Sequence, residues 1–277
     1  MPTVLKGLVV PIGVNSDRGP SPALWGRIRE VTDPNDAYEI FDDFLNFNGT
    51  VSTNVGTYSG QGGGYRSYED TGGSIVNLAS EVGGVLRITT DTTDNDEVWL
   101  QPGSATSVFG KISDTAGEDK LLIFEARVRF GQTANGNAFI GLTEEGLAAA
   151  DTITDAGAWA DKDAIGFLVL EDDSDGIDFI YKKAGQTLQT KISVAQQITA
   201  DTWYKLGFVY DPNAPEAKRI TVFVDGVDEG TYVTATNIAT ATFPDDEELQ
   251  PLFGVKNSSG AVTRIDLDWY RAYQCRV

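Results

Sequence analysis

The feature that most constrains this fold is an alternation of apolar and polar side chains with a period of two. From Leu122 to Phe130 every second residue is apolar, whereas Glu125 and Arg127 occupy positions in between. This period places one face of an extended strand in a core. The pattern therefore predicts β-strands at 76–79, 84–90, 97–101, 120–130, 138–142, 164–171, 177–183, 187–193, 202–210, 219–224, 228–233, 250–256 and 263–274.

Signals between these segments indicate tight turns and little helix. Asn135-Gly136 and Asp225-Gly226 are typical of two-residue hairpin turns. The one helical candidate is the short stretch 144–150, inside a long loop, and the glycine-rich segment 46–74 is predicted to be an irregular loop. Many short strands with little helix predict an all-β sandwich or barrel.

The composition excludes several chemistries. The chain contains no histidine and a single cysteine, Cys275. It therefore has no Ser-His-Asp triad, no Cys-His pair, no imidazole ligand for a metal and no disulfide within the chain. The residue types left for catalysis are carboxylates, lysine, tyrosine and serine.

The net charge limits the class of partner. The formal charge is −20, which opposes binding to nucleic acid or to an anionic membrane. No apolar run approaches the roughly 18 residues of a membrane span, and the N-terminus lacks the pattern of a signal peptide. We expect a protein made in the cytoplasm of its producing cell.

The first 37 residues differ from the remainder. They carry equal numbers of basic and acidic side chains and half of the prolines, so the negative charge belongs to residues 38–277. Proline disfavours regular helix, which predicts an extended N-terminal arm over 1–37 before a sandwich domain over 38–277. The arm is too apolar for a free tail. It packs either along its own domain or, as we favour, on another subunit, through Leu5, Leu8, Val9, Val10, Ile12 and Trp25.

Two segments near the C-terminus carry a family resemblance. Thr202-Trp203-Tyr204-Lys205-Leu206, followed by Ile220-Thr221-Val222-Phe223-Val224-Asp225-Gly226, resembles the laminin G-like and concanavalin A-like jelly rolls. The closing segment 265–274 is similar to the last strand of laminarinase-type glycoside hydrolases. The resemblance covers roughly residues 70–277 and implies an antiparallel jelly-roll β-sandwich.

The N-terminal part carries a second resemblance. Gly7-Leu8-Val9-Val10-Pro11-Ile12-Gly13, the run from Ser16 to Pro22 and Asp42-Asp43-Phe44 are similar to virion structural proteins of tailed bacteriophages. This resemblance implies that the arm attaches to the capsid and that the sandwich is displayed on the virion.

Glycosidase activity is not predicted. A laminarinase-type site needs Glu-x-Asp-x-(x)-Glu on one strand, so that three carboxylates share a face. The nearest approach is Glu171-Asp172-Asp173, and no second glutamate follows. We expect a protein without enzymatic activity.

Two ligand sites remain as hypotheses. Glu171, Asp173 and Asp175 are spaced like the opening of a calcium loop, but Lys182 stands where a helix-loop-helix calcium site needs glutamate. The alternatives are an ordinary acidic turn and a calcium site at the sandwich rim, as laminin G-like domains imply. Trp159 lies outside the predicted strands, where it either packs internally or stacks on a sugar.

Two functions of different classes follow. The first is a non-enzymatic capsid decoration protein, assembled as a homo-oligomer, most simply a trimer, whose arm binds the major capsid protein. The alternative is a lectin-like module that binds carbohydrate, such as host-surface glycans, with or without calcium. The arm favours the first function, because a free lectin module does not need one.

Overall fold

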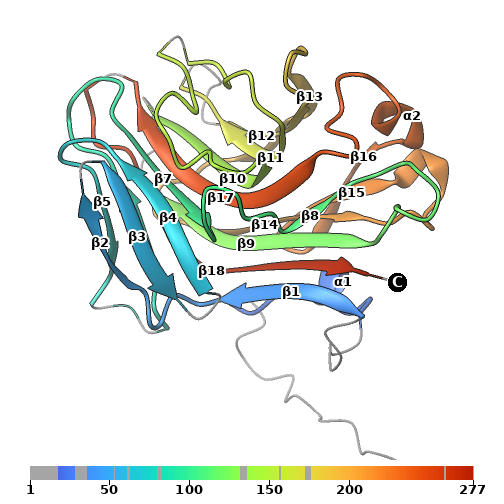
Figure 1. Cartoon of the computed structure of the whole chain (residues 1–277), viewed down its shortest axis with the longest axis horizontal. Coiled ribbons are helices and arrows are strands. Elements are labelled where there is room, and N and C mark those ends of the chain that lie inside the picture. Colours follow the sequence, from blue (N-terminus) through green and yellow to red (C-terminus); the bar gives the residue numbers. More distant parts are fainter. Residues whose placement is uncertain are drawn as a thin grey trace, which may run out of the picture.

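Two antiparallel β-sheets pack face to face in the computed structural model, and together they form a β-sandwich (Figure 1). The structure describes residues 18–28, 36–52, 54–60, 63–79, 81, 83–131, 136–155, 157–171, 176–258 and 260–276. The all-β jelly-roll sandwich predicted from the sequence is confirmed.

The eight-stranded sheet has the order β16-β15-β14-β9-β18-β6-β5, and β1 pairs with the second half of β18. Consequently the strand at the start of the sandwich lies beside the strand that ends it. The strands are β1 (Ala37–Asp42), β5 (Ser74–Asn77), β6 (Leu86–Thr89), β9 (Leu122–Phe130), β14 (Trp203–Tyr210), β15 (Ile220–Val224), β16 (Val227–Val233) and β18 (Arg264–Cys275).

The ten-stranded sheet has the order β13-β12-β11-β10-β17-β7-β4-β3-β2, with β8 paired to β17. Its strands are β2 (Asn48–Ser52), β3 (Val55–Gly60), β4 (Gly63–Glu69), β7 (Glu97–Pro102), β8 (Gly110–Lys111), β10 (Gly136–Thr143), β11 (Ala164–Val169), β12 (Gly176–Lys182), β13 (Gln189–Gln197) and β17 (Glu248–Asn257).

Helix is confined to single turns in the described part of the chain: α1 (Pro22–Trp25), α2 (Ala235–Ile238) and the 3-10 turn η1 (Glu216–Lys218). None of the helices there is long and apolar enough to cross a membrane. The helix predicted over 144–150 is wrong. This stretch forms turns, because its leucine and alanine side chains pack onto a sheet face instead of forming a helical stripe.

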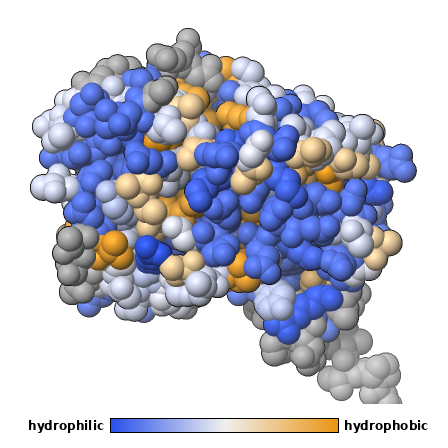
Figure 2. Space-filling model, turned by 45° about the horizontal axis from the view of Figure 1, so that its top comes forward, coloured by the Kyte–Doolittle hydropathy of each residue, from blue (hydrophilic) through white to orange (hydrophobic). Residues whose placement is uncertain are grey.

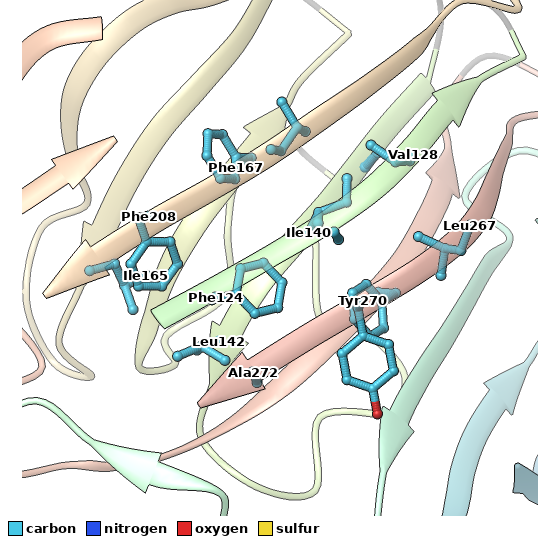
Figure 3. Packing of buried hydrophobic residues seen from close by; sticks show 14 of the residues in the cluster. Phe124, Val128, Ile140, Leu142, Ile165, Phe167, Phe208, Leu267, Tyr270 and Ala272 are labelled. Atoms are coloured by element: carbon cyan, nitrogen blue, oxygen red, sulfur yellow. The ribbon is translucent and has the colours of Figure 1, made fainter. Parts of the chain in front are cut away.

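Aromatic and aliphatic side chains from both sheets fill the space between them (Figure 3). The ring centroid of Phe124 on β9 lies 5.6 Å from that of Phe208 on β14 and 6.3 Å from that of Phe253 on β17. These are the inward positions of the alternation seen in the sequence. Burying such rings is a main source of stability for a sandwich.

The hairpin turn predicted at Asp225-Gly226 is confirmed. It joins β15 to β16, and both residues have positive φ, 50° and 77° respectively. Two positive φ values characterise the turn type that matches the twist of the flanking strands. The turn predicted at Asn135-Gly136 begins at a position outside the described residues.

The prediction of an irregular loop over 46–74 is wrong. This segment contains the antiparallel strands β2, β3 and β4, which extend the ten-stranded sheet. Tyr58 stacks on Phe47 with ring centroids 4.7 Å apart, and the Tyr65 hydroxyl donates a hydrogen bond to Asp42 Oδ2 at 2.6 Å. A Cβ at Gly49 would lie 2.4 Å from the Tyr58 ring, so glycine here permits close packing rather than disorder.

Candidate functional site

The outer face of the ten-stranded sheet is largely covered by the chain between β10 and β11, residues 144–163, here called the covering loop (Figure 1). Trp159 in this loop has its ring centroid 4.4 Å from that of Phe139 on β10. Its side chain is only 5% exposed, and its indole N–H donates to the Lys162 carbonyl at 3.2 Å. The expectation that Trp159 stacks on a sugar is therefore corrected, because the apolar sheet face beneath it takes up its ring.

Three side chains at alternate positions of β7 hold the covering loop. Glu97 accepts hydrogen bonds from the Asp151 backbone N–H and, at 2.7 Å, from the indole N–H of Trp99. Gln101 Oε1 accepts from the backbone N–H groups of Gly146 at 2.8 Å and Leu147 at 3.1 Å. Since a strand turns every second residue to the same side, β7 presents all three side chains to the loop.

A buried lysine completes the attachment of the loop. Lys256 on β17 donates to the Ile153 carbonyl and to Asp155 Oδ1, both at 2.8 Å. Burial raises the pKa of Glu97 to about 7, and its hydrogen bonds with Trp99 and Asp151 and the charge of Lys256 act in the opposite direction. Glu97 and Lys256 thus serve to fix a loop, and neither faces an open cleft.

The covering loop leaves one end of this sheet face open. A groove of about 540 Å³, here called the rim groove, lies there beside β3 and β4. Figure 2 shows hydrophobic side chains in patches between larger hydrophilic areas on this side of the molecule. The rim groove is lined by Val55, Thr57, Gly64, Tyr65, Arg66, Gly103, Ser104 and Ala105.

The outer face of the eight-stranded sheet carries residues 18–28, here called the docking segment. Glu125 on β9 accepts hydrogen bonds from the Ser21 backbone N–H at 3.0 Å and from the Trp25 indole N–H at 2.6 Å. The Arg18 guanidinium donates to Asp268 on β18, with Nε 2.9 Å from Oδ2. A Cβ at Gly207 would lie 2.7 Å from Leu24, so the sheet is shaped to receive this segment.

The docking segment changes the expectation for Trp25. This side chain is 7% exposed and packs with Leu24 and Val209 against its own sandwich. Trp25 is therefore corrected from a capsid contact to an internal one, because Glu125 offers its indole a buried acceptor. The other predicted attachment residues, Leu5, Leu8, Val9, Val10 and Ile12, lie outside the described residues.

Acidic side chains gather at the ends of three interior strands of the ten-stranded sheet, after β10 and at the start of β11 and β17. Two of them are paired: Lys162 with Glu144 at 2.8 Å and Lys183 with Glu247 at 2.7 Å. Burial and the charges of Glu247 and Glu144 raise the pKa of Asp163. The described residues contain no group of three or more carboxylate, histidine or cysteine side chains placed to hold a metal ion. This hollow is lined by Glu144, Glu145, Asp163, Asp246, Glu247 and Glu248.

The predicted calcium ligands are only partly described. Glu171 follows β11, and its backbone N–H donates to Asn137 Oδ1 at 3.0 Å. Asp173 and Asp175 lie outside the described residues. A calcium site at these three positions stays a prediction.

No protein-family model and no curated protein matches the sequence. Among solved structures, the chain is similar to a Shewanella oneidensis MR-1 protein of unknown function, with 16% identity, a TM-score of 0.50 and 87% of each chain covered. It is similar to an endo-β-1,4-glucuronan lyase from the fungus Trichoderma reesei, with 11% identity, a TM-score of 0.50 and coverage of 87% of this chain and 94% of the lyase.

Peanut lectin is a further similar structure, with 11% identity, a TM-score of 0.49 and coverage of 86% of this chain and 97% of the lectin. At these identities the similarities show the fold alone. The chain has the concanavalin A-like jelly-roll fold.

Proposed function

We propose that the protein is a non-enzymatic carbohydrate-binding module whose ligand lies in the rim groove. The observation that carries this proposal is the open groove itself, on a sheet face that the covering loop otherwise closes. Its volume of about 540 Å³ lies within the usual range for small-ligand sites. The fold is shared with a lectin and with an enzyme that acts on glucuronan.

The rim groove offers both apolar and polar groups, and a sugar ring needs both because it has an apolar C–H face and polar hydroxyl groups at its edge. Val55 and Ala105 offer apolar surface to the C–H face of a pyranose ring, and Thr57 and Ser104 offer hydroxyls to its edge. Arg66 has no hydrogen-bond or ion-pair partner among the described residues, so its donors are available to hydroxyl or carboxylate groups.

The absence of enzymatic activity is part of the proposal. General acid–base hydrolysis of a glycoside needs two carboxyl groups that reach the same bond. Glu97, the carboxylate at the centre of the covered face, already accepts hydrogen bonds from Trp99 and Asp151 beneath the loop. The lining of the rim groove contains no carboxylate.

Calorimetric titration with neutral and uronate-containing oligosaccharides tests this function. Ala105→Trp should fill the groove and abolish binding, whereas Ala116→Trp, at an exposed turn elsewhere, should leave binding unchanged. Arg66→Ala should weaken binding of uronate-containing ligands more than that of neutral ones. Failure of every carbohydrate to bind, or equal binding by Ala105→Trp and wild type, would reject the proposal.

A second candidate is a structural role in a virion, favoured by the docking segment. The sandwich holds Arg18 and Trp25 on its outer face, so the residue that follows segment 1–17 has a fixed place on the sheet. These residues are rich in apolar side chains and resemble the attachment region of bacteriophage virion proteins. On this proposal the sandwich decorates the capsid surface as an oligomer and Leu5, Leu8, Val9, Val10 and Ile12 make the attachment. The two functions are compatible.

Binding to capsids stripped of this protein tests the second function. A chain lacking residues 1–17 should keep its fold, because the docking segment stays intact, but should no longer bind. The matched control is Ala116→Trp in the full chain, which should bind normally. Normal occupancy by the shortened chain would place attachment on the sandwich and contradict the proposal.

A further inference from the structure

A second groove, of about 410 Å³, follows the open edge of the sandwich beside β1, and is here called the edge groove. Four consecutive residues of β1, 37–40, line one wall, so the groove runs along the backbone of the strand and not only over one of its faces. The opposite wall belongs to the other sheet and its connection. It includes Pro102, Gly103, Ser107, Val108 and Phe109.

One edge of β1 is available for pairing. Along its other edge β1 pairs with β18, from Ala37 opposite Cys275 to Asp42 opposite Tyr270. No strand of the described part of the chain lies on the groove side, where β1 forms the margin of the sheet (Figure 1). A strand edge with free N–H and C=O groups can accept an extended peptide as an added strand.

Apolar side chains flank this free edge. Tyr38 on β1 and Val108 on the opposite wall are each 45% exposed. An occupant with apolar residues at alternate positions would cover both side chains and pair with the backbone of β1. Glu39 and Arg276 also line the groove, and the Arg276 guanidinium lies 3.7 Å from the centroid of the Tyr38 ring. With one charge of each sign there, the edge groove suits an extended, mainly apolar peptide with little net charge.

We propose that residues 4–12 of a neighbouring copy of this chain bind in the edge groove as a strand added to β1. This inference does not depend on the carbohydrate-binding proposal. It assigns to self-association the same residues, Leu8 to Ile12, that the capsid proposal uses for attachment, so the two are alternatives for that segment. The segment Val4-Leu5-Lys6-Gly7-Leu8-Val9-Val10-Pro11-Ile12 has no acidic residue and a single lysine. In an extended conformation Leu8, Val10 and Ile12 share one face, which points into the groove. Proline is tolerated on an edge strand, where one N–H needs no partner.

Chain length favours a neighbouring copy over the same copy. Arg18 is fixed beside Trp269, whose indole N–H donates to the Arg18 carbonyl at 2.5 Å, near the Asp42 end of β1. The five residues 13–17 span at most about 17 Å, and the six residues of β1 extend over about 20 Å. The chain's own segment would therefore enter from the Asp42 end and run parallel to β1.

A neighbouring copy has no such constraint. Its segment can run antiparallel to β1, and antiparallel pairing is the more stable arrangement. Two whole molecules of charge −20 repel each other, but the segment 4–12 carries only a positive charge and can approach an acidic neighbour. Added salt should strengthen the association, since it screens the repulsion between the bodies.

Disulfide trapping in full-length chains tests the site. Cys275 is first replaced by serine, so that each chain carries one introduced thiol. Leu8→Cys and Val108→Cys chains are then mixed under mild oxidation, and a cross-linked pair of the two chains is expected. The control is Leu8→Cys with Val227→Cys, since Val227 is 65% exposed on β16, at the other end of the eight-stranded sheet. Cross-linking no greater than this control would overturn the proposal.

A chain with both Leu8→Cys and Val108→Cys identifies the donor of the segment. Cross-linked oligomers are expected at concentrations where the wild type self-associates. A product closed only within single chains would show that the segment binds its own groove, which contradicts assignment to a neighbour. Neither result bears on carbohydrate binding at the rim groove, which is measured separately.

Self-association provides a readout without cysteines. Val108→Asp should weaken self-association in sedimentation velocity by roughly tenfold or more, because it replaces a buried apolar contact with a charge. Val227→Asp should leave association unchanged, and the unfolding transitions of both variants confirm that they fold. A wild-type chain that stays monomeric at high concentration and high salt would also overturn the proposal.

Discussion

The two outer faces of the sandwich are covered in opposite ways. On the eight-stranded sheet the docking segment is held largely by charged groups, with Arg18 on Asp268 and the backbone of Ser21 on Glu125. On the ten-stranded sheet the covering loop combines hydrogen bonds to Glu97, Gln101 and Lys256 with the packing of Trp159 on Phe139. What distinguishes the two faces is an ion pair on the first and a large buried ring on the second. The packing of Trp159 on Phe139 is here called the hydrophobic plug.

Both faces nevertheless use the same polar contact. Glu125 accepts the indole N–H of Trp25 at 2.6 Å, and Glu97 accepts that of Trp99 at 2.7 Å. Burial raises the pKa of both carboxyl groups. A buried carboxylate is costly unless donors surround it, so each glutamate selects the one arrangement of the covering chain that supplies them.

The difference lies in how each covering segment is attached. The covering loop is joined to strands at both ends, β10 and β11, so it cannot leave without disturbing the sheet. The docking segment is joined to β1 through residues 29–36 only, and residues 1–17 precede it. We therefore expect damage to the loop to lower global stability and damage to the docking segment to cause local release.

The largest effect is expected for Trp159→Ala. Removing this ring from Phe139 leaves a cavity in the hydrophobic plug and should lower the free energy of unfolding by about 3–5 kcal/mol. Urea denaturation measures the change. The control is Trp203→Ala, which should cost much less because its partly exposed ring contacts the Arg127 and Arg129 guanidinium groups at the surface. Equal losses for the two variants would show that the loop does not act as a plug.

The second effect concerns pH. The pKa of Glu97 is raised from 4.5 to about 7, so the folded state binds this proton more tightly than the unfolded state. Its contribution to stability is complete below about pH 4.5 and is lost as the pH rises to about 7, a difference of about 3 kcal/mol. Wild type should lose this amount relative to Glu97→Gln between pH 4.5 and 7.5 in denaturant titrations. If the free energy of unfolding changed with pH in the same way for wild type and Glu97→Gln, this prediction would be wrong.

A matched pair of indole variants compares the faces directly. Trp99→Phe and Trp25→Phe each remove one N–H donor from a buried glutamate, and such a loss costs about 1–3 kcal/mol. For Trp99→Phe the loss should appear in global unfolding. For Trp25→Phe it should appear as faster hydrogen exchange in residues 18–28. The reverse assignment would show that the docking segment is part of the cooperative fold.

The smallest effect is expected for Arg18→Ala. Asp268 keeps a hydrogen bond from Arg127 at 2.7 Å, so the carboxylate stays paired. Arg18 is partly exposed, and we expect a loss of about 1 kcal/mol or less. Thermal unfolding at low and high salt measures it. A loss as large as that for Trp159→Ala would mean that the ion pair of Arg18 stabilises the protein as much as the hydrophobic plug does.

The sequence predicted the central strands well because their burial depends on simple alternation. In β9 and β14 the inward positions are apolar and the outward positions carry charges such as Arg127 and Lys205. In β18 a bulge after Leu267 breaks the alternation, so that Tyr270 and not Trp269 lies in the core. The charges on β9 and β14 mark a polar outer face, which the sequence alone could show. The sequence could not show that the docking segment covers this face, because Glu125 and Trp25, which are in contact, are 100 residues apart along the chain.

The sequence failed where burial depends on a distant segment. Tyr58 and Tyr65 stand among glycines, and only their packing on Phe47 makes β3 and β4 recognisable as strands. Trp159 stands among polar and small residues, and only Phe139 explains its burial. One signal was available: Glu97, Trp99 and Gln101 alternate on one strand, a polar–aromatic–polar face suited to holding a loop.

The placement of Arg18 also determines how the molecule would bear a pulling force. Tension entering through residues 1–17 reaches the sandwich at Arg18, which is bound to Asp268 and Trp269 on β18. That strand is flanked by β9 on one side and by β6 and β1 on the other, so the load enters the interior of the sheet. The marginal strand β1 would otherwise be peeled off first, one hydrogen bond at a time. The docking segment would thus bear the force before β1 does, and β1 would stay paired in the sheet until that segment detaches.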